Sequence, residues 1–253
     1  MARTERKKSR SGIYHIMLRG INRQTIFEDE EDKRKFLETL KKYKDISQYQ
    51  LYSYCLMDNH VHLLMREMDE TIAEAIKRIS SSYVYWYNLK YERVGHLFQD
   101  RFKSENVESN VYFLTVLRYI HQNPLKAGLE NSVWKCRWTS IHEYVQKVDM
   151  VDIDWGFRLF SEDRKQAIQL FIQYMQQQNH DECLDEEVKV RLSDSEVKKY
   201  LNEMGITHSS NLQKLDKEER DRILIMLKEL KGVNLRQLSR ITGISKSVIH
   251  RVR

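Results

Sequence analysis

Two kinds of hydrophobic periodicity alternate along the first half of the chain. Runs rich in β-branched and aromatic residues predict strands over residues 12–20, 51–57, 60–67 and 96–107. Apolar positions at helical spacing predict helices over residues 29–46, 70–91 and 110–122. The order strand–helix–strand–strand–helix–strand, with one extra helix, predicts an α+β fold of ferredoxin-like type. Such a fold is a four-stranded antiparallel sheet backed by helices.

Beyond residue 150 the pattern becomes entirely helical and more polar. Residues 161–180 predict a long polar helix, and an acidic linker follows at 179–187. Ser193 and Glu196 have the spacing of a capping box that opens another helix, and residues 216–230 are amphipathic. We therefore expect a first domain of residues 1–150, a helical linker of residues 151–192 and an all-α module of residues 193–253.

The last 21 residues, "VNLRQLSRITGISKSVIHRVR", have the spacing of a helix-turn-helix. Gly243 marks the turn, and apolar residues on either side of it are spaced to pack two helices together. A helical bundle that binds protein is the alternative. In a helix-turn-helix, the exposed side chains of the second helix would contact duplex DNA, and these are Ser245, Lys246, Ser247, His250 and Arg251.

Charge supports a polyanionic partner, because the chain carries 43 Lys and Arg against 37 Asp and Glu. The surplus is concentrated at the two ends, although a solvated tail would explain the N-terminal excess equally well. Three scattered cysteines argue against a disulfide framework or a thiolate zinc site. Neither a signal peptide nor an apolar stretch of about 20 residues is evident, so we expect a cytoplasmic protein with no membrane partner.

The stretch "MDNHVHLLM" carries the first candidate chemistry. Asp58-Asn59 predicts a hairpin turn. Side chains alternate along a strand, so His60 and His62 would share a face and suit a divalent metal. Two ligands make a poor site, and a third has to come from elsewhere in the chain. A structural pair of histidines is the alternative.

The only proline indicates where a third ligand lies. Pro124 disfavours helix at the preceding residue, so the helix that begins near residue 110 is expected to end near Asn123. Tyr119 and Asn123 would then share one face of the last turn. An amide oxygen is a reasonable ligand for Mg²⁺ or Mn²⁺.

Four motifs, "YHIMLRGINRQTIF", "NHVHLL", "GHLFQDRFKS" and "RYIHQNPLKAGL", together resemble the REP-associated tyrosine transposases. These are single-tyrosine HUH transposases of bacterial insertion sequences, and the resemblance spans roughly residues 10 to 145. It implies a metal-dependent endonuclease that acts on single-stranded DNA next to hairpins of palindromic repeats, as a monomer or a homodimer. By this resemblance His60 and His62 match the HUH pair, Tyr119 matches the nucleophile, and Asn123 matches a further metal-binding residue.

The chemistry of these residues agrees with the resemblance. A metal held by His60, His62 and Asn123 could polarise a scissile phosphate, and attack by Tyr119 would give a 5′-phosphotyrosine and a free 3′-OH. His121 would lie about 200° around the helix from Tyr119 and is left out of the site. DNA contacts are expected from five residues, of which the last two should share a strand face: Arg19, Asn22, Arg23, Arg101 and Lys103.

Two other functions remain open. A domesticated DNA-binding regulator would keep the fold without the chemistry, but the complete set of histidines, tyrosine and asparagine argues against it. A relaxase or replication initiator would share the chemistry, but the chain has no helicase motif. The "SSYVYWYNLKY" cluster (Tyr83, Tyr85, Tyr87, Tyr91) is interpreted as core packing, with some ring faces available to stack on bases.

Overall fold

The computed structural model describes residues 7–179, 181, 183–184, 192, 194–206, 212, 215–230, 233 and 235–252. The chain divides into two compact units, Met1–Asp185 and Glu186–Arg253. Ser193 of the predicted capping box and most of the predicted acidic linker lie outside the described residues.

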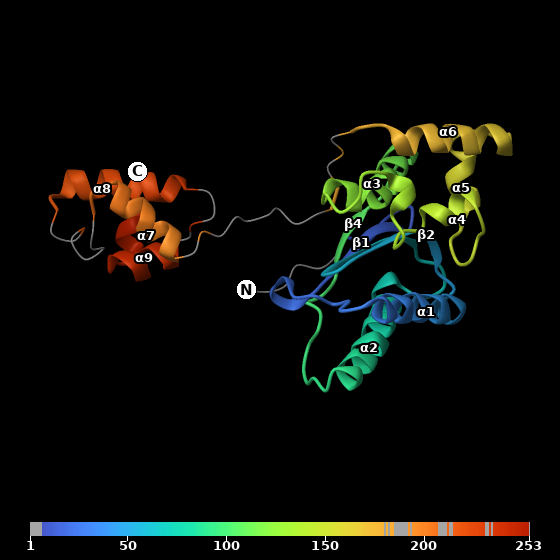
Figure 1. Ribbon diagram of the computed structural model, residues 1–253, viewed down its shortest axis with the longest axis horizontal. Coiled ribbons are helices and arrows are strands. Elements are labelled where there is room, and N and C mark those ends of the chain that lie inside the picture. Colours follow the sequence, from blue (N-terminus) through green and yellow to red (C-terminus); the bar gives the residue numbers. More distant parts are fainter. Residues whose placement is uncertain are drawn as a thin grey trace. The chain divides into compact units, whose positions relative to one another are not determined.

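The first unit is built on a four-stranded antiparallel sheet in the order β2-β3-β1-β4. Its strands are β1 (Ile13–Arg19), β2 (Gln50–Met57), β3 (His60–Arg66) and β4 (Lys103–Asn106). Helices α1 (Glu30–Ser47) and α2 (Ile72–Lys90) cover one face, and α3 (Asn110–Lys126) covers the other (Figure 1). The expected α+β fold is confirmed. Because helices cover both faces, the strands read as nearly continuous apolar runs rather than alternating ones.

Two boundaries differ from the sequence prediction. The last strand was expected over residues 96–107, but β4 begins only at Lys103, and earlier in this stretch Phe98 forms an isolated bridge with Gly20. The helix predicted to end near Asn123 continues through Pro124 to Lys126. A proline removes one backbone donor and disfavours helix in the residue before it, but tertiary packing overrides this preference here, since His121 to Pro124 are all buried.

Helices after α3 complete the core of the first unit. They are α4 (Ile141–Val145), α5 (Ile153–Arg158) and α6 (Arg164–Gln176), together with the short 3-10 helix η2 (Val133–Lys135). Phe171 is fully buried and stacks on Tyr144 with ring centroids 4.6 Å apart, and Phe157 packs beside both. Residues 151–176, expected as part of a linker, therefore form helices that are integral to the first unit. The apolar side of α6 was not recognised as a core-facing surface from the sequence.

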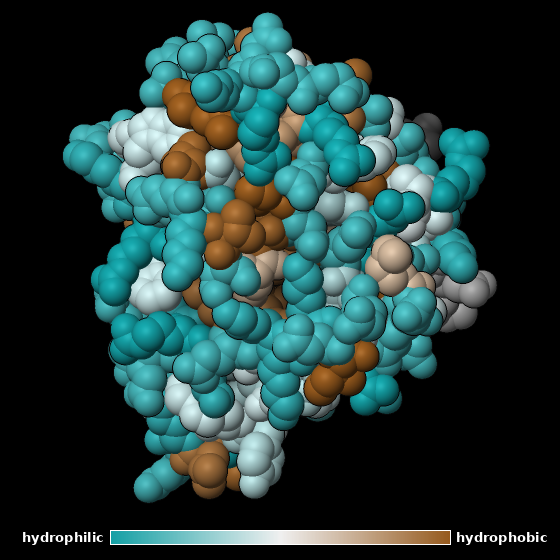
Figure 2. Space-filling view, turned by 90° about the vertical axis from the view of Figure 1, so that its right-hand side faces the viewer, coloured by the Kyte–Doolittle hydropathy of each residue, from teal (hydrophilic) through white to brown (hydrophobic). Residues whose placement is uncertain are grey.

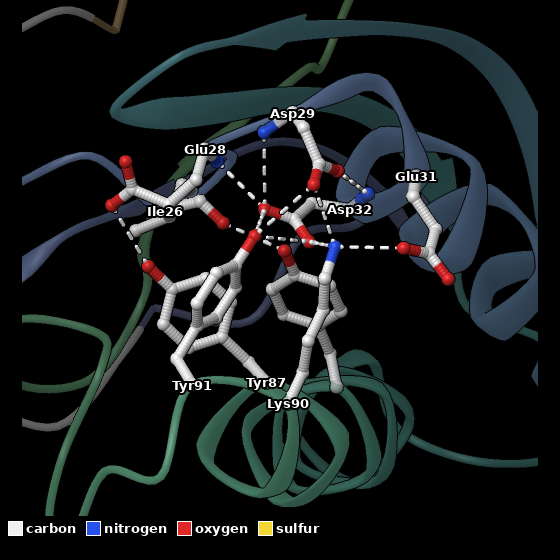
Figure 3. Close-up of polar contacts among 9 residues, drawn as sticks. Ile26, Glu28, Asp29, Glu31, Asp32, Tyr87, Lys90 and Tyr91 are labelled. Carbon is white, nitrogen blue, oxygen red and sulfur yellow. Dashed lines mark hydrogen bonds and ion pairs between the residues drawn. The ribbon is translucent and has the colours of Figure 1, made fainter.

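A buried carboxylate joins α1 to α2 (Figure 3). The side chain of Asp32 has no exposed surface, and it accepts hydrogen bonds from the backbone N–H of Glu28 at 2.6 Å and from the Tyr91 hydroxyl at 2.9 Å. The Lys90 ammonium lies 2.8 Å from Asp32 and also pairs with Asp29 and Glu31. A buried charge is tolerated only when it is paired and hydrogen-bonded, and Asp32 meets both conditions.

Tyrosines of α2 pack against α1 and the segment that precedes it. Tyr83 and Tyr87 are buried, and the Tyr83 hydroxyl donates to the carbonyl of Ile26 at 2.6 Å. Tyr85 points outward and is 75% exposed. The interpretation of this tyrosine cluster as core packing is confirmed for Tyr83 and Tyr87.

The second unit is helical throughout its described part. It contains α7 (Asp194–Glu203), α8 (Lys217–Glu229), α9 (Leu235–Thr242) and α10 (Lys246–Arg251). Leu224, Leu238 and Ile249 are among the residues of its own buried core. Gly243 adopts a φ of 69° between α9 and α10, a left-handed conformation that favours glycine.

Figure 2 shows one face, on which hydrophilic residues predominate and apolar residues gather in a few small groups. Among the described residues, every helix is too short or too polar to cross a membrane.

The Asp32 network leads to a stability prediction. Asp32→Asn removes the charge that faces Lys90 and replaces an acceptor oxygen by a donor, so the free energy of unfolding should fall by about 1–3 kcal/mol. All four tryptophans lie in the first unit, so urea unfolding followed by tryptophan fluorescence reports this unit alone. Glu31→Gln is the matched control, because Glu31 contacts the same ammonium from an exposed position; it should change stability by less than about 0.5 kcal/mol. Equal losses in both variants would contradict the role given to Asp32.

Candidate active site

The two histidines of β3 lie on the face of the sheet that α3 covers. His60 is the first residue of β3, and Asp58 and Asn59 form the two-residue turn before it. His62 follows two positions later, and the two ring centroids are 5.0 Å apart with the planes nearly perpendicular. The alternation of the strand therefore places both imidazoles side by side, as the sequence predicted.

Helix α3 brings Tyr119 to the histidines. The Tyr119 ring is 97% buried, and its centroid lies 5.7 Å from that of His62 in an edge-to-face arrangement. Asn123 is one turn further along the same helix and is also buried. Because α3 continues through Pro124, Tyr119 and Asn123 keep the i and i+4 relation of a regular helix.

The chemical state of His62 favours a metal ligand. Its Nδ1 lies 3.0 Å from Nε2 of His15, and its buried Nε2 has no hydrogen-bond partner among the described residues. Burial, followed by the neighbouring His15 and His60, lowers the pKa of His62 well below its ordinary value. The ring is therefore neutral near neutral pH, as a metal ligand must be.

His60 also has a polar neighbour in the hairpin turn. His60 contacts the Asn59 side-chain oxygen through Nδ1 at 2.6 Å, an outer contact of the kind that orients ligating imidazoles. Within the part of the chain that the structure describes, no three His, Cys, Asp or Glu side chains form a metal-binding group. The amide of Asn123, one turn beyond Tyr119 on α3, is the further donor that the sequence predicts.

Two neighbours of the site were not found from the sequence. His15 lies in the middle of β1, with its ring 5.1 Å from His62 and 5.8 Å from Tyr119. Lys126 holds its ammonium 4.7 Å from the centre of the Tyr119 ring and donates to the Asp181 carbonyl at 2.7 Å. His15 is the second residue of the motif "YHIMLRGINRQTIF", but its position beside His62 depends on the register between β1 and β3. Lys126 lies beyond the predicted end of the helix.

Residues expected to contact DNA lie along strands and turns next to the histidines. Met17 is paired with both His62 and Lys103, so Lys103 shares the histidine face of the sheet. Arg19 is paired with His60 and shares that face too. Arg101 was expected on the same strand as Lys103, but it lies in a bend before β4 begins, so the argument that the two share a strand face is wrong.

The turn after β1 reaches the hairpin that precedes His60. Asn22 and Arg23 are exposed in the 3-10 helix η1 (Ile21–Arg23), and both adopt positive φ values, of 51° and 63°. The Asn59 side chain donates to the Arg23 carbonyl at 3.4 Å. These exposed polar residues therefore border the histidine pair.

The remaining predicted residues lie elsewhere. His121 is buried on another side of α3, where its Nε2 contacts the Ser140 hydroxyl at 2.8 Å, so its exclusion from the site agrees with the structure. Burial, followed by the charge of His142, lowers the pKa of His121 to about 3. In the second unit, the residues expected to contact duplex DNA are all exposed on or just before α10: Ser245, Lys246, Ser247, His250 and Arg251.

Comparisons with known proteins find similar structures and a matching protein family. The chain has 16% identity to a REP-associated tyrosine transposase whose structure was determined bound to a REP hairpin, with a TM-score of 0.51 over 57% of this chain and 86% of that one. A transposase from Deinococcus radiodurans R1, described as putative, also has 16% identity, with a TM-score of 0.35 over 48% of this chain and 97% of that one. Among proteins of curated function, none matches the chain. The family model described as "Transposase IS200 like" matches residues 8–123, the segment that contains both histidines, Tyr119 and Asn123. Through this segment of its first unit, the chain resembles the IS200-like transposases.

Proposed function

We propose that this protein is a transposase that cleaves and rejoins single-stranded DNA next to hairpins, with Tyr119 as the nucleophile and a divalent metal, Mg²⁺ or Mn²⁺, held by His60, His62 and Asn123. The observation that carries the proposal is the position of the Tyr119 ring against His62, 5.7 Å away, on the face of the sheet that also holds His60. A phosphate placed between these groups would meet the Tyr119 hydroxyl on one side and, on the other, a cation held by the two imidazoles.

Single-stranded DNA is the substrate that this surface suits. The structurally similar REP-associated transposase was determined with a REP hairpin, and a hairpin presents unpaired nucleotides beside a short duplex. In this chain, Lys103 and Arg19 share the face of the histidines and provide positive charge for the phosphates. The exposed polar turn of Asn22 and Arg23 would extend the same contact surface.

The reaction exchanges one phosphodiester for another. The bound cation would polarise the scissile phosphate and neutralise the charge that develops on its oxygens. The Tyr119 hydroxyl loses its proton and attacks phosphorus in line with the leaving 3′ oxygen. The P–O3′ bond breaks, the 3′ oxygen takes up a proton, and the 5′ phosphate remains on Tyr119. A second 3′-OH can reverse this step and join strands, because the number of phosphodiester bonds is unchanged.

Trapping of the covalent intermediate tests the nucleophile. With Mn²⁺ and a single-stranded hairpin oligonucleotide, the protein should form an adduct that is visible on a denaturing gel. Tyr119→Phe should abolish the adduct while DNA affinity changes less than about threefold, because the ring is retained and only the attacking oxygen is lost.

Tyr85→Phe is the matched control for this experiment. Tyr85 lies on α2 and is 75% exposed, so the control should form the adduct at the wild-type rate. Persistence of the adduct in Tyr119→Phe would exclude Tyr119 as the nucleophile. A wild-type protein that binds the hairpin but forms no adduct with any divalent metal would instead support the DNA-binding regulator.

The role of Asn123 leads to a metal-dependence prediction. If its amide oxygen binds the cation, Asn123→Ala should raise the Mn²⁺ concentration for half-maximal cleavage by about 10-fold or more, and excess Mn²⁺ should partly restore the rate. Asn123→Asp keeps an oxygen donor of the same length and should remain within a few-fold of the wild type. A loss in Asn123→Ala that no Mn²⁺ concentration restores would show that the residue supports α3 instead.

The second unit is proposed to bind duplex DNA as a helix-turn-helix module while the first unit carries the chemistry. Lys246 and Arg251 are exposed on α10, whereas Ile249 between them anchors this helix in the core. This exposed basic surface supports the proposal, because phosphate contacts require accessible cations. The alternative, a protein-binding bundle, has no comparable need for them.

Salt dependence distinguishes these two roles in the full chain. Loss of two phosphate contacts in a Lys246→Gln, Arg251→Gln variant should reduce the slope of log affinity against log salt by about 1.8 for duplex DNA. The rate of adduct formation at saturating hairpin DNA should not change. Lys217→Gln, at the exposed start of α8, is the control. It removes one positive charge from the second unit away from α10. An unchanged slope in the double variant would leave the second unit without a role in duplex binding.

A further inference from the structure

His15 is a buried polar residue at the centre of the sheet. It lies in the middle of β1 with no exposed surface, and its cross-strand partners are Leu64 on β3 and Glu105 on β4. An apolar side chain would fill such a position at a lower cost of desolvation. A histidine at this point therefore calls for an explanation beyond packing.

The contacts of His15 reach both parts of the candidate active site. Its Nε2 lies 3.0 Å from Nδ1 of His62, and its ring meets the Tyr119 ring edge-on with centroids 5.8 Å apart. His62 is the diagonal neighbour of His15 across the β1–β3 pair, because Met17 is opposite His62 and Leu64 is opposite His15. Both histidines therefore project to the side of the sheet that α3 covers.

The hydrogen bond between the two rings determines which nitrogen of His62 can bind a cation. A neutral imidazole carries one proton, and only the nitrogen without it has a lone pair to offer. If the proton of His62 is on Nδ1, it is donated to Nε2 of His15, and the lone pair of His62 is on Nε2. That Nε2 is the buried atom without a hydrogen-bond partner among the described residues.

We propose that His15 is a positioning residue, whose Nε2 accepts the Nδ1–H of His62 and so directs the Nε2 lone pair of His62 toward the divalent metal. This inference rests on the proposed metal-binding role of His62. In this arrangement His15 is not a ligand, because its Nε2 lone pair accepts the Nδ1–H of His62 and its own Nδ1 then carries the proton of the neutral ring. The arrangement fixes both the tautomer and the ring orientation of His62, the two properties that an outer hydrogen bond gives to a ligating histidine.

The first test needs neither metal nor DNA. Two-bond ¹⁵N–¹H correlation spectra of the full, metal-free chain report the tautomer of each histidine, at about pH 8 where the rings are neutral. We expect His62 to carry its proton on Nδ1 in the wild type. His15→Leu should shift His62 toward the Nε2–H form that predominates in an isolated ring. A wild-type His62 with its proton on Nε2 would overturn the proposal, even if the His15 variants fail to fold.

The second test measures Mn²⁺ affinity without turnover, from the electron paramagnetic resonance signal of free Mn²⁺. His15→Leu removes the acceptor and should weaken Mn²⁺ binding by about 10- to 100-fold. His15→Gln places an amide oxygen at a similar reach and should restore affinity to within a few-fold of the wild type. Equal affinity of His15→Leu and the wild type would overturn the proposal, as would equal weakening in both variants.

His121→Leu is the matched control, because His121 is another fully buried histidine and its hydrogen bond is made to Ser140 instead. Its Mn²⁺ affinity should equal that of the wild type. These readouts separate this inference from the proposed function. If the wild type binds Mn²⁺ but Tyr119 forms no adduct, the proposed chemistry fails and the role of His15 stands. If the wild type binds no Mn²⁺ at all, the metal site itself fails, and the inference fails with it.

Discussion

The register between β1 and β3 is the constraint on which the active-site face depends. Strand side chains alternate, so a slip of one residue would turn His60 and His62 toward α1 and α2 and away from Tyr119. Hydrogen bonds fix the pair at both ends, from Gly20 N–H to the Asn59 carbonyl and from Glu67 N–H to the Gly12 carbonyl, each at 2.9 Å. At Gly20 a Cβ would lie 2.1 Å from the Gln24 carbonyl oxygen. The end of the strand beside His60 is therefore closed by a turn that accommodates only glycine.

The helix layer on the opposite face reaches the same hairpin. The backbone N–H groups of Ile26 and Phe27 both donate to the Asp58 carbonyl, at 2.7 and 3.1 Å. The next residue, Glu28, donates its backbone N–H to Asp32, which pairs with Lys90 in the network that joins α1 to α2. The turn before His60 is thus held by the segment that begins α1. Because outer contacts orient the ligands of a metal site, this support of the turn is as relevant to the proposed site as the residues on its own face.

The sequence was sufficient for the features that depend on local pattern. Runs of β-branched and aromatic residues identified three of the four strands closely. Period-two alternation placed His60 and His62 on one face of a strand, and helical spacing placed Tyr119 and Asn123 on one side of α3. Features that depend on distant contacts were not accessible. The contact of His15 with His62 joins residues 47 positions apart in the chain and requires the register of two strands that a helix separates. The burial of Phe171 and the passage of α3 through Pro124 likewise depend on packing, which overrides local preference.

Helix α3 is held in place by the segment that leaves the first unit. Arg118, next to the proposed nucleophile, makes two hydrogen bonds to the Asp181 carboxylate, at 2.8 and 2.9 Å, and Lys126 donates to the Asp181 carbonyl. Gln122 adds contacts to the Met175 and Gln177 carbonyls from the same side of the helix. One side of α3 therefore faces the buried histidines, and another is bonded to the residues that follow α6. The position of Tyr119 over the sheet thus depends on Met175, Gln177 and Asp181, which lie well outside the segment that matches the transposase family. These residues are therefore structural parts of the unit that carries the candidate active site.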